Sequence, residues 1–279
     1  MSLGQLKIFK MKKLVYFFGI FALIAGFVTS CGDDDDDDEG NGNSGGKTVS
    51  QKKLKKLVDD NYYWEYTYDK DGRFASYSEF YQNEPSENAN YKYESNKIIE
   101  ECCLLDGTVR CVTTINLDSN GYIESETTEN GGSFDKTVYS YDNQGHLISE
   151  KYTDEESGEL ETITYTWENG NISKVAVKNI YGGAESEYVR YFEYTNSSYT
   201  SPVENKVGIN MLQISDGFIS PFYSAGGVAL KNLPVTIKYE GEDMHDVQTL
   251  TWTLDADGYP VKVTTKNGFD VDSIEFVWE

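Results

Sequence analysis

The sequence predicts an all-β protein: an antiparallel up-and-down meander of about sixteen strands, closed into a large barrel that an apolar insertion plugs. Three observations predict it. A short aromatic unit with its own turn recurs about every 24 residues, and the repeat is interrupted only once. The chain of 279 residues is long enough for one large β-domain with a sizeable core.

The repeat unit reads aromatic-x-aromatic-Asp, then turn residues with Gly, then an apolar residue. Two aromatic side chains spaced in this way share one face of a strand. Asp at the first and Gly at the fourth turn position favour a type I turn, with Gly in the φ > 0 conformation of a bulge. Each unit is therefore a hairpin. The units span residues 66–74, 91–98, 115–123, 139–147, 165–172 and 252–261, with a closing half-unit at 276–279.

The β-domain begins at residue 52 and ends at 279. Residues 53–59 have apolar side chains at helical spacing, yet Leu54 takes the place that Leu147 and Ile172 hold in their units, so a strand is predicted. Tyr that alternates with Thr or Glu is typical of a sheet's core face, with the hydroxyls reaching water.

The interruption covers residues 201–233, where the turn rhythm stops and apolar residues dominate. An open twisted sheet rarely holds so many strands, and closure removes the unpaired edges. A barrel this wide is not filled by its own side chains. The insertion, partly helical in this interpretation, is therefore expected to be the plug. Two stacked sheets are the alternative architecture.

The N-terminus predicts export. A Lys cluster, fifteen apolar residues from Leu14 to Val28 and small residues precede Cys31, so residues 1–30 are expected to be a signal peptide and Cys31 the lipidated residue. Residues 31–51 join an acidic run to Gly, Ser and Asn, a composition typical of a solvated tether. The expected location is the outer membrane, anchored by lipid and exposed at the cell surface.

The charge balance restricts the partners. Four of the 24 basic residues lie in the first thirty residues, which leaves 20 against 47 acidic residues, a net charge of −27. Such a chain repels nucleic acid. A membrane through the lipid, and a glycan or a protein, are the partners left open, and the sequence gives no oligomeric state.

Three further cysteines lie close together in the sequence. Asp106-Gly107 is a two-residue hairpin signal. It pairs Cys102 with Cys111 and Cys103 with Arg110. A Cys102–Cys111 disulfide is therefore predicted, with two buried thiols as the alternative, and exported proteins favour the bond. Cys103 is expected to point outward as a free thiol.

Motifs for catalysis, cofactors and metals are missing from the sequence. Asp69-x-Asp71-Gly72 and Asp255-x-Asp257-Gly258 lack the remaining ligand positions of a calcium loop and are interpreted as turns. No catalytic or cofactor-binding residue is assigned. The adjacent aromatics Tyr62, Tyr63 and Trp64 cannot all face the core, so these three are the predicted ligand contacts.

The hairpin units resemble the YD repeats of Rhs-type surface proteins. The lipobox-like Val28-Thr-Ser-Cys31, the units, the insertion, Asn232-Leu-Pro234 and Asp257-Gly-Tyr-Pro260 together resemble a Bacteroidota lipoprotein family of unknown function. That family is described as having a porin-like fold. The resemblance implies a barrel and no activity.

The leading functional hypothesis is a non-enzymatic surface module that binds a glycan, protein or host component or has a structural role. The alternative is a carrier that holds a small apolar or glycan ligand inside the barrel. A glycan-processing hydrolase is third, since pairs of carboxylates occur by chance among 47 acidic residues.

Overall fold

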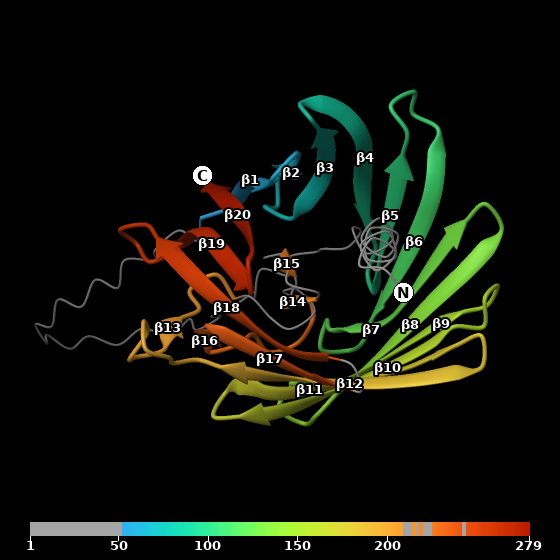
Figure 1. Cartoon of the computed structure of the whole chain (residues 1–279). Coiled ribbons are helices and arrows are strands. Elements are labelled where there is room, and N and C mark those ends of the chain that lie inside the picture. Colours follow the sequence, from blue (N-terminus) through green and yellow to red (C-terminus); the bar gives the residue numbers. More distant parts are fainter. Residues whose placement is uncertain (1–51, 209–213, 216–217, 220–224, 242–243) are drawn as a thin grey trace, which may run out of the picture.

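The computed structural model describes residues 52–208, 214–215, 218–219, 225–241 and 244–279, and its strands form a closed antiparallel barrel (Figure 1). The predicted signal peptide (1–30), lipidated Cys31 and tether (31–51) lie outside the described residues. Among the described residues no helix is long and apolar enough to cross a bilayer.

The barrel has sixteen strands in meander order, and the last pairs with the first. The predicted fold class is confirmed, and the alternative of two stacked sheets is wrong. The strands are β1 (Leu54–Asp59), β2 (Tyr62–Tyr68), β3 (Phe74–Tyr81), β4 (Glu84–Tyr93), β5 (Lys97–Cys103), β6 (Val109–Leu117), β7 (Ile123–Asn130), β8 (Ser133–Tyr141), β9 (Leu147–Asp154), β10 (Leu160–Glu168), β11 (Asn171–Tyr181), β12 (Ala184–Glu193), β17 (Thr236–Gly241), β18 (Met244–Leu254), β19 (Pro260–Asn267) and β20 (Asp270–Trp278).

The Asp-Gly segments form the predicted turns. In the β2–β3 turn, Asp69 Oδ1 accepts hydrogen bonds from the amides of Asp71 and Arg73 at 2.9 and 2.8 Å. The Gly72 amide donates to the Asp69 carbonyl at 3.0 Å, and Gly72 has φ of 79°. A bulge follows in the ladder. This turn-and-bulge arrangement is the one that the repeat predicts.

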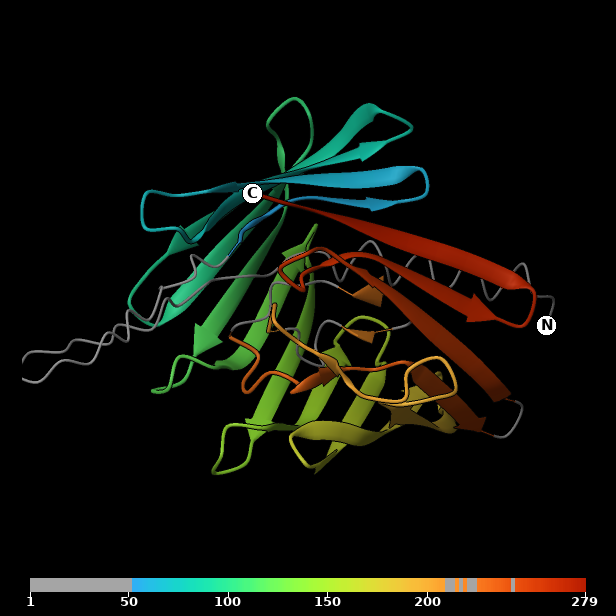
Figure 2. The same ribbon diagram turned by 90° about the vertical axis from the view of Figure 1, so that its left-hand side faces the viewer.

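An up-and-down meander gives the barrel two unlike ends. One end, here the capped end, carries the Asp turns and both ends of the domain, where Lys53 and Glu279 exchange two backbone hydrogen bonds. The other, here the free end, carries the described hairpin tips after β1, β3, β5, β7, β9, β11 and β19. Figure 2 shows the strands running between the two ends.

The insertion contains the ribbon of β13 (Val203–Glu204) with β16 (Asn232–Leu233) and that of β14 (Ile214–Ser215) with β15 (Phe218–Ile219). Its described flanks, residues 203–208 and 225–233, lie across the capped end. Its backbone bonds to three parts of the barrel: the Ile123 amide donates to Ala225, Val228 donates to the Gly145 carbonyl, and Lys231 donates to that of Gly170, at 2.8 to 2.9 Å. The described part of the insertion contains no helix, so the expectation of partly helical structure is wrong there.

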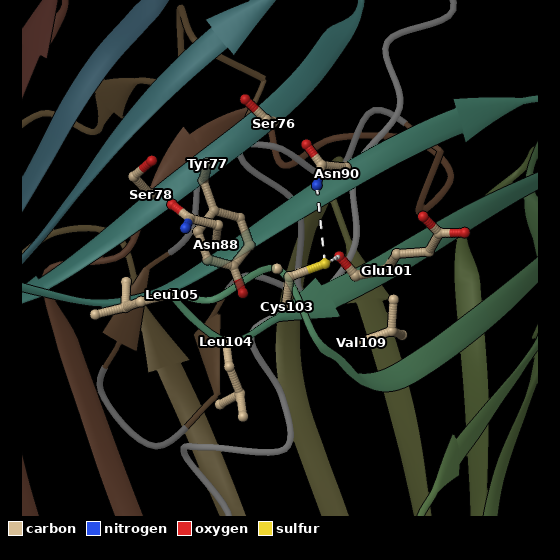
Figure 3. Close-up of a pocket in the computed structure, with 11 residues that line it drawn as sticks. Ser76, Tyr77, Ser78, Asn88, Asn90, Glu101, Cys103, Leu104, Leu105 and Val109 are labelled. Carbon is tan, nitrogen blue, oxygen red and sulfur yellow. Dashed lines mark hydrogen bonds between the residues drawn. The ribbon is translucent and has the colours of Figure 1, made fainter.

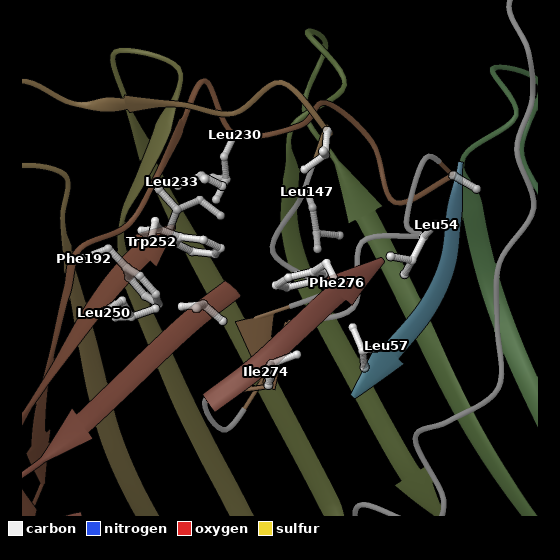
Figure 4. Packing of buried hydrophobic residues seen from close by; sticks show 14 of the residues in the cluster. Leu54, Leu57, Leu147, Phe192, Leu230, Leu233, Leu250, Trp252, Ile274 and Phe276 are labelled. Atoms are coloured by element: carbon white, nitrogen blue, oxygen red, sulfur yellow. The ribbon is translucent and has the colours of Figure 1, made fainter. Parts of the chain in front are cut away.

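The side chains of the insertion complete the core at this end. Leu230 and Leu233 are buried with strand residues such as Leu147 and Trp252 (Figure 4). Gly227 approaches the β8–β9 turn so closely that a Cβ there would stand 2.5 Å from the Gly145 carbonyl oxygen. The described insertion therefore packs as a cap, because its apolar residues remove the ends of the strands from water.

In most repeat units the second position is an aromatic residue that closes the core in a regular way; Leu117 and Leu254 are the exceptions. The hydroxyl or indole N–H of this aromatic donates to a backbone carbonyl at the start of the preceding, directly paired strand. These bonds, 2.6 to 3.0 Å long, join Tyr68 to Leu54, Tyr93 to Phe74, Tyr141 to Ile123, Trp167 to Leu147, Tyr194 to Ile172 and Trp278 to Pro260. The four tyrosine hydroxyls therefore bond to backbone carbonyls, and the expectation that they reach water is wrong for them. A buried carbonyl needs a donor, and the aromatic side chain supplies it. The bond explains why Tyr and Trp rather than Phe occupy the position.

The outer wall of the barrel is polar. Cross-strand ion pairs stand on it at several heights, including Lys56 with Glu65 (3.3 Å), Lys92 with Glu101 (2.6 Å) and Lys262 with Glu275 (2.9 Å). Exposed pairs of this kind add little stability. They show that charged side chains cover much of the face opposite the core, where exposed apolar residues such as Val138 and Val277 stand singly.

Candidate functional site

The strand register divides the inward-facing side chains into two zones. Near the capped end they are apolar, as at Leu54, Ile123 and Ile172, each at most 1% exposed. Towards the free end, carboxylates, amides and tyrosines take their place, as at Asp135 and Asn179 on β8 and β11. Both zones face the inside because opposite residues of an antiparallel pair share a face.

Three glutamates mark the boundary between the zones. Glu100, Glu126 and Glu150 lie on β5, β7 and β9, shortly after the buried apolar residue that opens each strand. Glu100 is fully buried and Glu150 is 6% exposed. Each carboxyl receives a hydrogen bond from a tyrosine of a neighbouring strand: Tyr91 to Glu100, Tyr139 to Glu126 and Tyr165 to Glu150.

Burial favours the neutral form of these three carboxyls. It raises the pKa of Glu126 to about 8, with a smaller contribution from the charge of Glu150. Burial likewise raises the pKa of Glu150 to about 7, although the Tyr165 hydroxyl and nearby Arg190 act in the opposite direction. The pKa of Glu100 stands well above its usual range for the same first reason. Sequence analysis did not identify these three glutamates. The available signal was their position in the repeat, because other units carry a core residue there, such as Tyr77 or Val175.

Pairs of carboxyls face each other nearer the free end. Glu79 stands directly opposite Glu87, and Asp135 opposite Asp154. Glu87 is balanced by Arg110 at 2.8 Å, while Glu79 accepts from the Trp64 indole at 3.0 Å. Among the described residues, no group of His, Cys, Asp and Glu is arranged to hold a metal ion.

The predicted cysteine pair stands in register. Cys102 lies directly opposite Cys111 on the lumen face, and both are present as buried thiols. Their mutual hydrogen bond, helped by Arg110, lowers the pKa of Cys111 and raises that of Cys102. The disulfide itself stays a prediction.

Around this pair the local register differs from the predicted one. The β5–β6 turn is a four-residue turn in which Gly107 donates to the Leu104 carbonyl. Cys103 therefore faces Val109 rather than Arg110. Arg110 becomes a bulge residue, which sends its guanidinium to Glu87. The longer turn and the bulge at Arg110 shift the strand register by one residue each, in opposite directions. The two shifts cancel, so Cys102 still stands opposite Cys111.

The three predicted aromatic contacts do not form one surface. Tyr62 and Trp64 lie on the lumen side, opposite Asp59 and Leu57. Tyr63 faces outward, stacked on Phe80 with ring centroids 4.4 Å apart, and the Lys56 ammonium lies 3.5 Å from its centroid. One of the three faces outward, as adjacency requires. Their contact with a ligand stays a prediction.

A groove of about 520 Å³ lies on the outer face of β3 to β6. Its floor presents hydroxyl and amide groups, and its wall is the β5–β6 tip (Figure 3). Asn90 reaches the Cys103 thiol at 4.0 Å, and Cys103 faces outward as predicted. The lining residues are Ser76, Tyr77, Ser78, Asn88, Asn90, Glu101, Cys103, Leu104, Leu105, Gly107 and Val109.

A closed sixteen-strand meander with a polar zone inside belongs to the class of porin-like barrels. Within that class, the chain belongs to the DUF4595 family: the model for the "domain of unknown function (DUF4595) with porin-like fold" matches residues 66–262. The predicted kinship with a family of porin-like fold and unknown function is thereby confirmed.

Solved structures agree on the fold. The chain is similar to a porin-like protein from Bacteroides uniformis ATCC 8492, with a TM-score of 0.59 and 16% identity over 81% of this chain and 98% of that one. A complex described as TcdB2-TccC3-Cdc42 matches 78% of this chain and 14% of its own, at 13% identity and a TM-score of 0.29, and supports no structural argument. No curated protein matches.

Proposed function

We propose that this chain is a non-enzymatic binding module, held to the outer membrane by a lipid at Cys31 and exposed at the cell surface, with the free end of the barrel as its binding face. The proposal rests on one observation: the most exposed apolar side chains lie at the free end. Phe269 is fully exposed, and Leu105, Tyr181 and Val271 are more than half exposed. All four belong to hairpin tips of the free end or directly adjoin them.

The two barrel ends support this orientation. A tether that ends at residue 51 joins the domain at its capped end, beside Glu279. The free end then points away from the anchor. Apolar side chains gathered on one end of a monomer are typical of an interaction surface.

The outer wall supports anchorage by lipid rather than by the barrel itself. A wall embedded in a bilayer carries an apolar band, whereas this wall carries ion pairs such as Lys178 with Glu185 and Lys262 with Glu275. Charged side chains on a lipid-facing strand are costly.

The two other hypotheses have less support. For a hydrolase, the carboxyls with raised pKa values are the natural candidates, but Glu100 and Glu150 are buried and bonded to tyrosines, away from any substrate. For a carrier, an apolar ligand needs an apolar chamber. The described apolar zone is instead filled by Leu230, Leu233 and the strand residues around them.

A binding screen on the immobilised chain tests the proposal. The probes are plant, host and microbial glycans, and basic, acidic and neutral peptides, each tested on the wild type and on a Tyr181→Ser/Phe269→Ser variant. Val138→Ser, which changes an exposed residue in the middle of the outer wall, is the matched control. We expect at least one probe class to bind the wild type and the control but not the tip variant. Binding that all three chains share, or no binding at all, would overturn the proposal.

A further inference from the structure

Four side chains of β5 and β6 form one hydrogen-bonded row near the free end of the lumen. The Arg110 guanidinium donates to the Cys111 sulfur. Cys102 stands directly opposite Cys111, and its single proton has two acceptors within reach: the Cys111 sulfur and Glu100 Oε1, the latter 3.8 Å from the Cys102 sulfur. A cation, two sulfurs and a carboxyl therefore follow one another. These four residues are the thiol row.

The two sulfurs of the thiol row have different chemistry. The hydrogen bond from Cys102, and after it the charge of Arg110, lower the pKa of Cys111 to about 7. The same hydrogen bond, burial and the charge of Glu100 raise the pKa of Cys102. The thiolate is the nucleophile of cysteine chemistry, and a thiol whose pKa lies near the ambient pH attacks disulfides best. Cys111 is therefore the attacking sulfur, and Cys102 stays protonated beside it.

The thiol row is reached from the free end. Cys102 and Cys111 form one of the last rungs of the β5–β6 ladder before its turn. Cys111 is 8% exposed, whereas the Arg110 side chain beside it is 34% exposed. A molecule that enters at the free end therefore meets Arg110 and then the Cys111 sulfur. The small exposed fraction of that sulfur restricts the reaction to small molecules.

Glu100 is placed to take the proton of Cys102. Its side chain is fully buried, and Oε2 has no hydrogen-bond partner among the described residues. Oε1 accepts from the Tyr91 hydroxyl at 3.3 Å as well as from Cys102. Burial raises the pKa of Glu100 well above its usual range, so its carboxylate is a stronger base than that of an exposed glutamate.

We propose that Cys111, Cys102 and Glu100 form a thiol–disulfide exchange site that reacts with small disulfides. The Cys111 thiolate attacks one sulfur of the disulfide, so that a mixed disulfide forms at Cys111 and one thiolate leaves. Cys102 then passes its proton to the Glu100 carboxylate and attacks the Cys111 sulfur. The Cys102–Cys111 bond forms, and the second thiolate leaves. Two electrons pass from the cysteine pair to the small disulfide, and the two protons that the cysteines lose convert the leaving thiolates into thiols.

The inference goes beyond the predicted Cys102–Cys111 disulfide, which is the product of the exchange. It assigns an order of attack, a proton acceptor and reversibility. A small thiol runs the same steps backwards, with the Glu100 carboxylic acid protonating Cys102 as that sulfur leaves. The exchange is stoichiometric, with one disulfide consumed per chain, and it does not depend on the proposed binding function.

The test follows the two steps separately. Cys31→Ser and Cys103→Ser leave Cys102 and Cys111 as the only thiols of the full chain. The folded chain is reduced with dithiothreitol, which is then removed, and hydroxyethyl disulfide is added. Acid quenching and mass spectrometry give the amounts of reduced chain, mixed disulfide and internal disulfide over time. An uncharged probe is used because the net charge of the chain does not repel it.

Three variants in this background separate the roles of the residues. Cys102→Ser should stop at the mixed disulfide, and Cys111→Ser should react at least about tenfold more slowly than Cys102→Ser. Glu100→Gln should form the mixed disulfide at the unchanged rate and convert it to the internal disulfide at least about tenfold more slowly. Glu101→Gln is the matched control, since Glu101 is the next residue, pairs with Lys92 on the outer wall at 2.6 Å, and should leave both steps unchanged.

Three results would overturn the inference. The first is a Cys102–Cys111 bond that dithiothreitol reduces only after urea has unfolded the chain, since such a bond only supports the fold. The second is an equal rate for Cys102→Ser and Cys111→Ser. The third is a Glu100→Gln chain in which both steps slow together or neither step slows. The two serine variants keep Glu100, so they decide the order of attack even where Glu100→Gln does not fold.

Discussion

Replacing Glu150 with Gln should make the barrel more stable at neutral and basic pH. The change keeps the shape of the side chain and an oxygen that can accept from Tyr165, but it removes a charge that burial disfavours. Burial raises the pKa of Glu150 from 4.5 to about 7 in the folded state. A raised folded-state pKa means that the neutral carboxyl stabilises the fold fully below pH 4.5, and that this stability is lost as the pH rises through 7.

The magnitude follows from the two pKa values. Each pH unit between them corresponds to about 1.4 kcal/mol, so the wild type loses about 3 kcal/mol through this residue between pH 4 and pH 8. Glu150→Gln does not lose it. The variant should therefore equal the wild type near pH 4 and exceed it by up to about 3 kcal/mol near pH 8.

Urea unfolding at several pH values measures the difference directly. All other ionisable groups titrate in both chains, so the difference between the curves reports Glu150 together with its smaller effect on the pKa of Glu126. Glu124→Gln, at an exposed position of β7, is the control and should show no comparable pH dependence. A Glu150→Gln difference that stays constant from acid to base would refute the burial of an ionisable carboxyl inside the wall.

Further expectations concern the cap, the aromatic tips and the thiols. Gly227→Ala should cost more stability than Gly183→Ala, by about 1–3 kcal/mol from overpacking, since both glycines have positive φ but only Gly227 contacts a turn; equal losses in thermal unfolding would contradict the cap. Tyr93→Phe should cost about 1–3 kcal/mol in urea unfolding, because a buried carbonyl loses its donor, and no loss would refute the bond. Oxidation with glutathione disulfide should start at Cys111, whose lowered pKa favours the thiolate, and should end in a bond to Cys102 with two glutathiones released; peptide mapping that joins a different pair would refute it.

Much of the fold could be predicted because its information is local. Asp69 and Gly72 carry the whole turn signal within four residues, so counting units gives the strand number. The alternation of apolar and polar residues along each strand predicted which side chains face the core. The need to remove unpaired strand edges predicted that the sheet closes into a barrel. The Cys102–Cys111 register was predicted correctly although its derivation was not, because the turn and the bulge at Arg110 each shift the register by one residue in opposite directions.

The rest could not be predicted because it depends on contacts between distant residues. Alternation gives a side chain's face but not its depth, so Glu150 and an exposed glutamate look alike in the sequence. The seating of Gly227 on the β8–β9 turn joins segments about eighty residues apart, and no local pattern encodes it. For the candidate site, adjacency correctly required one of Tyr62, Tyr63 and Trp64 to face outward. Pairs of carboxyls such as Asp135 and Asp154 follow only from the register of the strands.

Single-cysteine labelling tests most directly the claim that the barrel is sealed at one end and negatively charged and accessible at the other. The native cysteines are first replaced by alanine, and single cysteines are then introduced at three positions. Thr137→Cys lies on the lumen side between Glu126 and Tyr152. Val235→Cys lies in the buried core at the capped end, and Thr164→Cys lies on the exposed outer wall. Cationic and anionic methanethiosulfonate reagents are compared. We predict that Thr137→Cys favours the cationic reagent by about tenfold over the ratio at Thr164→Cys, and that Val235→Cys reacts only after unfolding. Equal reagent rates at Thr137→Cys, or fast labelling of native Val235→Cys, would contradict the claim.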